Sequence, residues 1–158
     1  MNAGPRIRIL FVCTGSLCRS PIAEGFLRAK LFDAGMADEV LVDSAGIFAQ
    51  PGRAPEPMAV EVAAEYEVDI SALSSRPFEQ TDFEQFDQLI GMDLGHLDYL
   101  QATCPPTCTA EIRLLLDDVA ELKKVEVPDP YRQNLDAYEF STRLINVGIE
   151  DLMGRLAR

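Results

Sequence analysis

One segment near the N-terminus constrains the fold more than any other part of the chain. Residues 6–12 are mostly β-branched or aliphatic, and the small-residue run of residues 13–19 follows them. Ser20 and Pro21 come next, and serine at an N-cap followed by proline at the first helical position is a typical helix start. The pattern predicts a strand, a loop and then a helix that continues to about Ala34.

The rest of the chain repeats this alternation of strands and helices. Further strands are predicted at residues 40–44, 88–92 and 112–116, and further helices at residues 58–66, 94–100 and 136–156. Such alternation predicts an α/β fold, with a central four-stranded parallel sheet, helices on both faces and the residue 13–19 loop after strand 1. Ligands bind beyond the carboxyl ends of strands in such sheets, which is where this loop begins. We expect residues 1–158 to form a single domain.

The charge balance limits the partners that the chain can have. Its 158 residues include 26 acidic and 14 basic side chains, for a net charge of -12. A chain of this charge repels nucleic acid and anionic membranes, so we expect neither as a partner. Its apolar runs are shorter than the roughly 18 to 20 residues of a membrane span, and no signal peptide is recognisable. We therefore expect a cytoplasmic protein whose four cysteines stay reduced.

We expect no cofactor and no metal ion. The single histidine, His96, follows a predicted strand without other metal ligands nearby, and it is interpreted as a surface residue. The cysteine pairs, at positions 13 and 18 and at positions 104 and 108, lack the usual spacing of zinc sites. The segment between Cys104 and Cys108 is predicted to be an exposed loop.

Cys13 and Arg19 are separated by five residues at the junction of the first strand and helix. Backbone N–H groups of such a loop can converge on a phosphate dianion, and a guanidinium can bind two of its oxygens. Thiols near helix N-termini and cations also ionise more readily than free cysteine, so the same loop would activate Cys13 as a nucleophile. The predicted phosphate-binding residues are Thr14, Gly15, Ser16, Leu17, Cys18 and Arg19.

This spacing also occurs by chance, and a cysteine that ends a buried strand can simply fill space. The wider sequence decides between these interpretations, because it resembles the low-molecular-weight protein-tyrosine phosphatase family along essentially the whole chain. The resemblance is carried by residues 11–24, 43–46, 82–87, 92–93, 112–116 and 127–131. The cysteine loop together with the distant Asp-Pro-Tyr is very specific to that family.

The resemblance implies hydrolysis of phosphotyrosine, in a protein or as a small aryl phosphate, through a phosphocysteine on Cys13. It gives Asp129 the role of general acid and base, and Ser20 that of a hydroxyl that hydrogen-bonds the thiolate. It makes Tyr131 one aromatic wall of the substrate site and suggests Phe48 as the opposing wall. Prolines on both sides of Asp129 would hold its carboxyl on a stiff loop.

The chain departs from the family at two positions that brace the phosphate loop. Ser16 stands where relatives usually have asparagine, and Leu73 where they have the histidine that bonds to it. Asparagine tolerates left-handed backbone angles better than serine does. We expect apolar packing to replace the lost pair, with Ser44 as a remaining contact, and the change to affect loop rigidity and turnover rate rather than reaction class.

Other functions remain open from the sequence. One is a thioredoxin-coupled arsenate reductase, although Cys104 and Cys108 lie late in the chain for its relay. Another is a phosphotyrosine-binding module that has lost catalysis. Cys18 is a candidate redox residue, because its thiol could form a disulfide with an oxidised Cys13. We expect a monomer or a weak homodimer.

Overall fold

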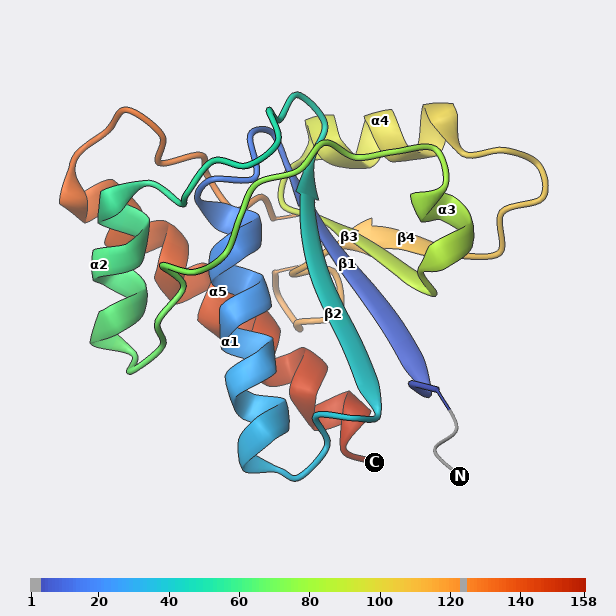
Figure 1. Ribbon diagram of the computed structural model, residues 1–158, viewed down its shortest axis with the longest axis horizontal. Coiled ribbons are helices and arrows are strands. Elements are labelled where there is room, and N and C mark those ends of the chain that lie inside the picture. The colour runs from blue at the N-terminus through green and yellow to red at the C-terminus, as the bar shows by residue number, and fades with distance from the viewer. Residues whose placement is uncertain (1–3, 123–124) are drawn as a thin grey trace.

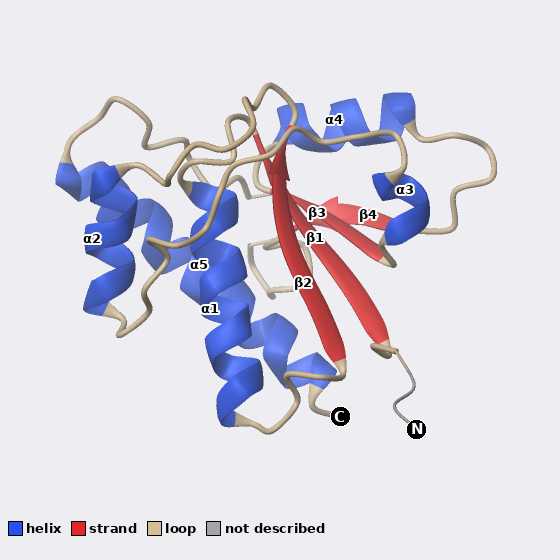
Figure 2. Ribbon diagram, in the orientation of Figure 1, coloured by secondary structure: helices blue, strands red, loops and turns tan. Residues whose placement is uncertain are grey.

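The computed structural model describes residues 4–122 and 125–158, so the predicted domain of residues 1–158 includes five residues outside the described ones. Four strands and five helices are found in these ranges (Figures 1 and 2). In chain order they are β1 (Ile7–Cys13), α1 (Arg19–Asp33), β2 (Val40–Gly46), α2 (Pro57–Glu65), α3 (Asp82–Gln85), β3 (Gln88–Gly91), α4 (Leu94–Thr103), β4 (Glu111–Leu114) and α5 (Leu135–Leu156). Among these described residues, no helix is both long and apolar enough to cross a bilayer.

The strands form one parallel sheet in the order β2-β1-β3-β4. Helices α1, α2 and α5 lie on one side of the sheet, and α3 and α4 lie on the other (Figure 1). The predicted α/β fold with a four-stranded parallel sheet is confirmed. Strand β2 pairs with one edge of β1, and β3 pairs with its other edge. The order in which strands are added to the sheet therefore reverses at the carboxyl end of β1. Ligands bind at such points.

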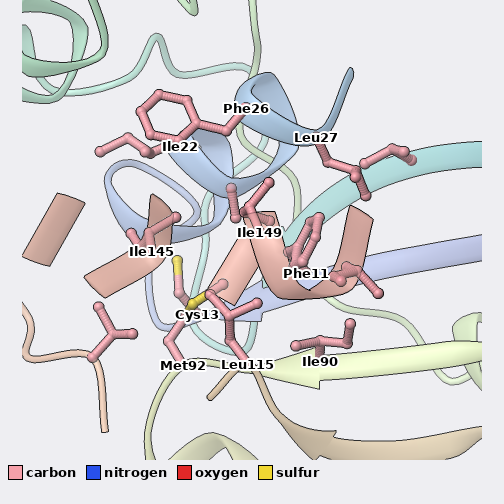
Figure 3. Packing of buried hydrophobic residues seen from close by; sticks show 14 of the residues in the cluster. Phe11, Cys13, Ile22, Phe26, Leu27, Ile90, Met92, Leu115, Ile145 and Ile149 are labelled. Carbon is pink, nitrogen blue, oxygen red and sulfur yellow. The ribbon is translucent and has the colours of Figure 1, made fainter. Parts of the chain in front are cut away.

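Strand β1 is buried on both faces. Ile9, Phe11 and Cys13 belong to the larger core, which includes residues of α1 and α5; Figure 3 shows Phe11 and Cys13 within it. Leu10 and Val12 belong to the smaller core with Phe83 of α3 and Leu100 of α4. This explains why the strand has a nearly continuous apolar sequence, as central parallel strands do. Because β1 is packed on both faces, the position of Cys13 at its carboxyl end is fixed.

The start of α1 differs from the sequence-based prediction. The helix begins at Arg19 with Cys18 at the N-cap, so Ser20 lies inside the first turn and the prediction of Ser20 as the N-cap was wrong. Its hydroxyl instead lies 3.0 Å from the Cys13 sulfur. Pro21 remains harmless in the first turn, because N–H groups there have no acceptor within the helix.

Candidate active site

The loop between β1 and α1 is held by hydrogen bonds that its carbonyl groups accept from residues later in the chain. The carbonyl of Cys13 accepts from the Ile47 N–H at 3.0 Å, and the carbonyl of Thr14 accepts from the Phe48 N–H at 2.9 Å. The Leu17 carbonyl accepts from the Glu56 N–H at 3.0 Å. In contrast, the backbone N–H groups of residues 14–19 donate to no acceptor within the described chain. The loop is therefore anchored from outside, while its donors remain available for an anion.

The end of β2 packs directly against this loop at Gly46. A Cβ atom at Gly46 would lie 2.5 Å from the Thr14 carbonyl oxygen and 2.7 Å from the Ser16 nitrogen. Such distances are far below van der Waals contact, so only glycine permits the approach. Any other residue here would displace the loop.

Ser16 has the left-handed backbone conformation expected from the family asparagine, with φ of 59°. Its side chain is buried, and its hydroxyl has no hydrogen-bond partner within the described chain. Leu73 packs against the larger core, as predicted. The predicted contact of Ser44 with the loop is not observed, because its hydroxyl donates to Glu24 at 2.6 Å. The loop thus has neither the asparagine nor the histidine of the usual brace.

The Arg19 side chain is only 2% exposed, and one of its terminal nitrogens, Nη1, is held by hydrogen bonds to residues outside the loop. Its Nη1 donates to Asp93 Oδ2 at 2.8 Å and to the Val127 carbonyl at 2.9 Å. Burial works against ionisation of Asp93, but the hydrogen bond and charge of Arg19 and the contacts with His96 together outweigh it and hold the pKa of this carboxyl below its usual range. Nε and Nη2 of Arg19 make no hydrogen bond within the described chain, which leaves a two-pronged donor for phosphate oxygens.

Asp129 lies on a loop that reaches back to the site between β4 and α5. Its Oδ2 is 3.5 Å from Arg19 Nη2, and its Oδ1 accepts from the Tyr131 N–H at 3.1 Å. The side chain is 46% exposed. Ser141 of α5 secures the loop by donating to the Pro128 carbonyl at 2.6 Å.

A cavity of about 240 Å³ opens above the loop. It brings together Cys13, Arg19, Asp129, Phe48 and Tyr131, which the sequence had proposed from three separate segments. Phe48 is 77% exposed and Tyr131 38%, so both rings form part of the accessible lining. Thr14, Gly15, Leu17 and Cys18 also line the cavity, whereas Ser16 and Ser20 are buried and do not line it.

Gln50 and Arg53 also line the cavity, although neither was predicted from the sequence. Both belong to the Pro- and Gly-rich segment between β2 and α2, where no periodic pattern marks which side chains face inward. Asp93 was noted only as part of the resemblance, and its role as the partner of Arg19 was also missed.

The prediction of His96 as a surface residue was wrong. Its side chain is 1% exposed, and its Nδ1 accepts from the N–H groups of Met92 and Asp93, each at 3.2 Å. Its Nε2 lies 3.0 Å from Thr14 Oγ1. Burial lowers the pKa of His96 to about 4, so the ring is neutral at physiological pH. The Asp-x-x-His spacing at the start of α4 is a capping box in which histidine replaces the usual glutamate, and that spacing was the available signal.

Cys18 is buried, and burial raises the pKa of its thiol to about 12. Its sulfur is 3.5 Å from the Tyr138 hydroxyl. All four cysteines are free thiols. Cys104 and Cys108 are half-buried rather than fully exposed, and both pack against the smaller core.

Comparison with known proteins identifies the family of the chain. The model of the low molecular weight phosphotyrosine protein phosphatase family matches residues 8–158. The chain belongs to this family. A low molecular weight protein-tyrosine-phosphatase of Streptomyces coelicolor is 33% identical over 150 residues, covering 92% of this chain and 91% of the relative. The resemblance inferred from the sequence is therefore confirmed.

Two solved structures extend the comparison. YfkJ from Bacillus subtilis superposes with a TM-score of 0.89 at 30% identity, covering 99% of this chain and 98% of its own. The YwlE arginine phosphatase from Geobacillus stearothermophilus superposes with a TM-score of 0.83 at 26% identity, covering 96% of this chain and 93% of its own. Family membership confirms the expected enzyme class, a phosphatase and hence a hydrolase.

Proposed function

We propose that this enzyme hydrolyses phosphotyrosine, in proteins or as small aryl phosphates, through a phosphocysteine on Cys13. The observation that supports this most directly is the shared cavity: Cys13, Arg19 and Asp129 line it together with the aromatic residues Phe48 and Tyr131. The first three groups are what a two-step phosphoryl transfer needs. The rings suit a substrate whose leaving group is a phenol.

In the first step, the Cys13 thiolate attacks phosphorus and the bond from phosphorus to the phenolic oxygen breaks. The loop N–H groups and Arg19 bind the equatorial oxygens as their charge changes. The Asp129 carboxyl gives its proton to the departing phenolate. Ser20, 3.0 Å from the sulfur, donates its hydroxyl hydrogen to the thiolate before attack.

In the second step, the Asp129 carboxylate takes a proton from water, and the resulting nucleophile attacks the phosphocysteine. The bond from phosphorus to sulfur breaks, inorganic phosphate leaves, and Cys13 returns as a thiolate that Ser20 again stabilises. The carboxyl of Asp129 recovers its proton, so the cycle closes without a metal ion or cofactor.

Phosphoarginine is a second candidate substrate, because solved relatives include a protein named as an arginine phosphatase. The cavity of this chain favours the aryl substrate instead. Its lining includes Arg53, whose cation would repel a second guanidinium, together with Leu17, Phe48 and Tyr131. A peptide carrying phosphotyrosine should therefore be hydrolysed with a higher kcat/KM than the same peptide carrying phosphoarginine.

The test compares these two peptides and adds a generic aryl phosphate. Faster hydrolysis of phosphoarginine would replace the proposed substrate while leaving the chemistry intact. Absence of any turnover would favour a binding module over an enzyme acting on these substrates. Thioredoxin-dependent reduction of arsenate, measured in parallel, would favour the reductase.

A further inference from the structure

We propose that His96 is a positioning residue for the phosphate loop, holding Thr14 in place of the brace that Ser16 and Leu73 no longer provide. The inference rests on the proposed function, because it concerns the loop that would bind phosphate. It is motivated by one partly buried contact between elements far apart in the sequence. His96 Nε2 and Thr14 Oγ1 lie 3.0 Å apart across 82 residues.

The hydrogen bonds of the ring fix its tautomer. Nδ1 accepts from two backbone N–H groups, those of Met92 and Asp93, each at 3.2 Å, and Asp93 Oδ1 lies slightly farther from it at 3.3 Å. The two closer N–H donors favour a lone pair on Nδ1. A neutral imidazole carries its hydrogen on the other nitrogen. Nε2 is therefore the donor, and Thr14 Oγ1 is its acceptor.

Thr14 is the residue at which such a bond controls the loop. It directly follows the proposed nucleophile, and its own N–H is the first donor of the phosphate cradle. The Phe48 N–H holds its carbonyl at 2.9 Å, and His96 holds its side chain. Two residues further on, Ser16 has a left-handed backbone and no side-chain hydrogen bond within the described chain.

The turn between β3 and α4 is built to bring the ring this close. A Cβ atom on Gly91 would lie 2.9 Å from the His96 Cβ, so glycine at this position makes room for the histidine. Asp93 then accepts from the His96 N–H at 3.1 Å with Oδ1 and from Arg19 at 2.8 Å with Oδ2. A single turn of chain thus holds both ends of the loop, Thr14 through the ring and Arg19 through the carboxylate.

The ring remains a donor over the range in which such an enzyme works. The charged groups that face it are Asp93, Arg19 and Asp129, but burial dominates and keeps the ring neutral down to a pKa of about 4. Protonation would place a hydrogen on Nδ1 against the N–H groups of Met92 and Asp93, with Asp93 Oδ1 3.3 Å away, and burial opposes the resulting charge. The contact should therefore persist above about pH 5.

Two substitutions at position 96 distinguish the hydrogen-bonding roles of the two ring nitrogens. Asparagine places its oxygen near the Nδ1 position, so His96→Asn keeps the acceptor for Met92 and Asp93 but loses the donor to Thr14. Glutamine places its amide near Nε2, so His96→Gln keeps the donor and loses the acceptor. Thr103→Val at the far end of α4, where the hydroxyl donates to the Tyr99 carbonyl at 2.7 Å, is a matched control for loss of a hydrogen bond in the same helix.

The experiment measures kcat on a series of aryl phosphates, together with melting temperature, for these variants, for Thr14→Val and for the double variant with His96→Asn. One lost hydrogen bond corresponds to about 0.5–1.5 kcal/mol, so we expect His96→Asn and Thr14→Val each to lower kcat about two- to tenfold, equally for good and poor leaving groups. The double variant should be no slower than the slower single variant, and His96→Gln should retain more activity than His96→Asn.

Additive losses in the double variant, or a His96→Asn enzyme as fast as one carrying Thr103→Val, would overturn the positioning role. An inactive wild-type enzyme would instead mean that the proposed function is wrong, so the two failures are distinguishable.

Discussion

The phosphate loop and the Asp129 loop meet at one cavity but are held in opposite ways. In the phosphate loop, Cys13, Ser16 and Arg19 are each at most 3% exposed, and the backbone is anchored by carbonyl contacts on several sides. In the other loop, Asp129 is 46% exposed and Tyr131 is 38% exposed. In the proposed mechanism, a preorganised cradle must be complete before substrate arrives, whereas the proposed acid, Asp129, must admit the substrate between itself and the proposed nucleophile, Cys13. The difference predicts that mutations in the two loops have different kinetic signatures.

The largest expected effect comes from removing the proposed nucleophile, Cys13, while keeping the cradle. Cys13→Ser should abolish turnover yet retain binding of phosphate or vanadate, because a serine hydroxyl ionises far less readily than a thiol while the N–H groups stay in place. Steady-state hydrolysis and oxyanion inhibition or calorimetry measure the two properties separately. Substantial residual activity would remove Cys13 from its role.

Arg19→Lys should be nearly as damaging, although the charge is kept. A lysine ammonium cannot bind two phosphate oxygens as a fork and cannot keep the contacts with Asp93 and the Val127 carbonyl at the same time. Both phosphate affinity and kcat should fall, in contrast to Cys13→Ser. Near-normal kinetics would show that the guanidinium does not hold phosphate.

Asp129→Asn tests the exposed loop, and its effect should depend on the substrate. We expect kcat to fall about 10²-fold or more on phenyl phosphates with poor leaving groups, the usual scale for a lost general acid. The defect should shrink as the phenol becomes more acidic, because a good leaving group needs no proton. A loss of equal size across the series would mean that Asp129 supports the structure rather than the chemistry.

The buried turn that supports the phosphate loop should make stability depend on pH. The pKa of His96 falls from 6.5 to about 4 on folding, so the unfolded chain binds more protons between these values. Stability from this group is complete above about pH 6.5 and is lost as pH falls toward 4, by about 3 kcal/mol in total. Urea unfolding from pH 7 to 4 measures this, and His96→Asn should flatten that part of the profile. An equal pH slope in both proteins would contradict the assignment.

The smallest expected effect concerns Cys18, and it appears only under oxidation. Peroxide would convert the Cys13 thiolate to a sulfenic acid, and the Cys18 thiol would displace water from it to form a disulfide. Because burial raises the pKa of Cys18 to about 12, this trapping should be slow and incomplete. Wild type and Cys18→Ser are treated with peroxide and then with a thiol reductant, and the recovered activity of the two proteins is compared. The mass of the peptide that contains Cys13 and residue 18 is measured by mass spectrometry after the peroxide step. Equal recovery without a disulfide would leave Cys18 a packing role only.

Local sequence was sufficient for the fold and for the centre of the site. The apolar run of β1, the small residues after it and the helical period of α5 each specify their own structure, and alternation then implies the parallel sheet. Cys13 and Arg19 were predictable because they flank a single turn. Asp129, Tyr131 and Phe48 required the resemblance, since a proline-flanked aspartate by itself is more often an exposed turn.

Contacts between distant elements could not be predicted in the same way. The burial of His96 follows from its position over Gly91 and against Thr14, and no periodicity within Leu94–Thr103 marks it. The Ser20 hydroxyl lies 3.0 Å from the Cys13 sulfur, but Ser20 was misplaced as a cap, because the hydrogen-bond geometry of the first turn determines the helix start. Helix α3, with four residues, is too short to produce a pattern.

The most direct test of the proposed mechanism, in which Cys13 takes the phosphoryl group and Asp129 acts as acid and base, is to trap the phosphocysteine intermediate. The Asp129→Asn enzyme should still be phosphorylated by an aryl phosphate with a good leaving group, but without a base its attack by water is slowed. Acid quenching in the steady state, followed by peptide mass analysis, should then find one phosphoryl group on the peptide containing Cys13, and none after Cys13→Ser is added. Continued turnover with no phosphoryl group on Cys13, or with the group on another residue, would contradict it.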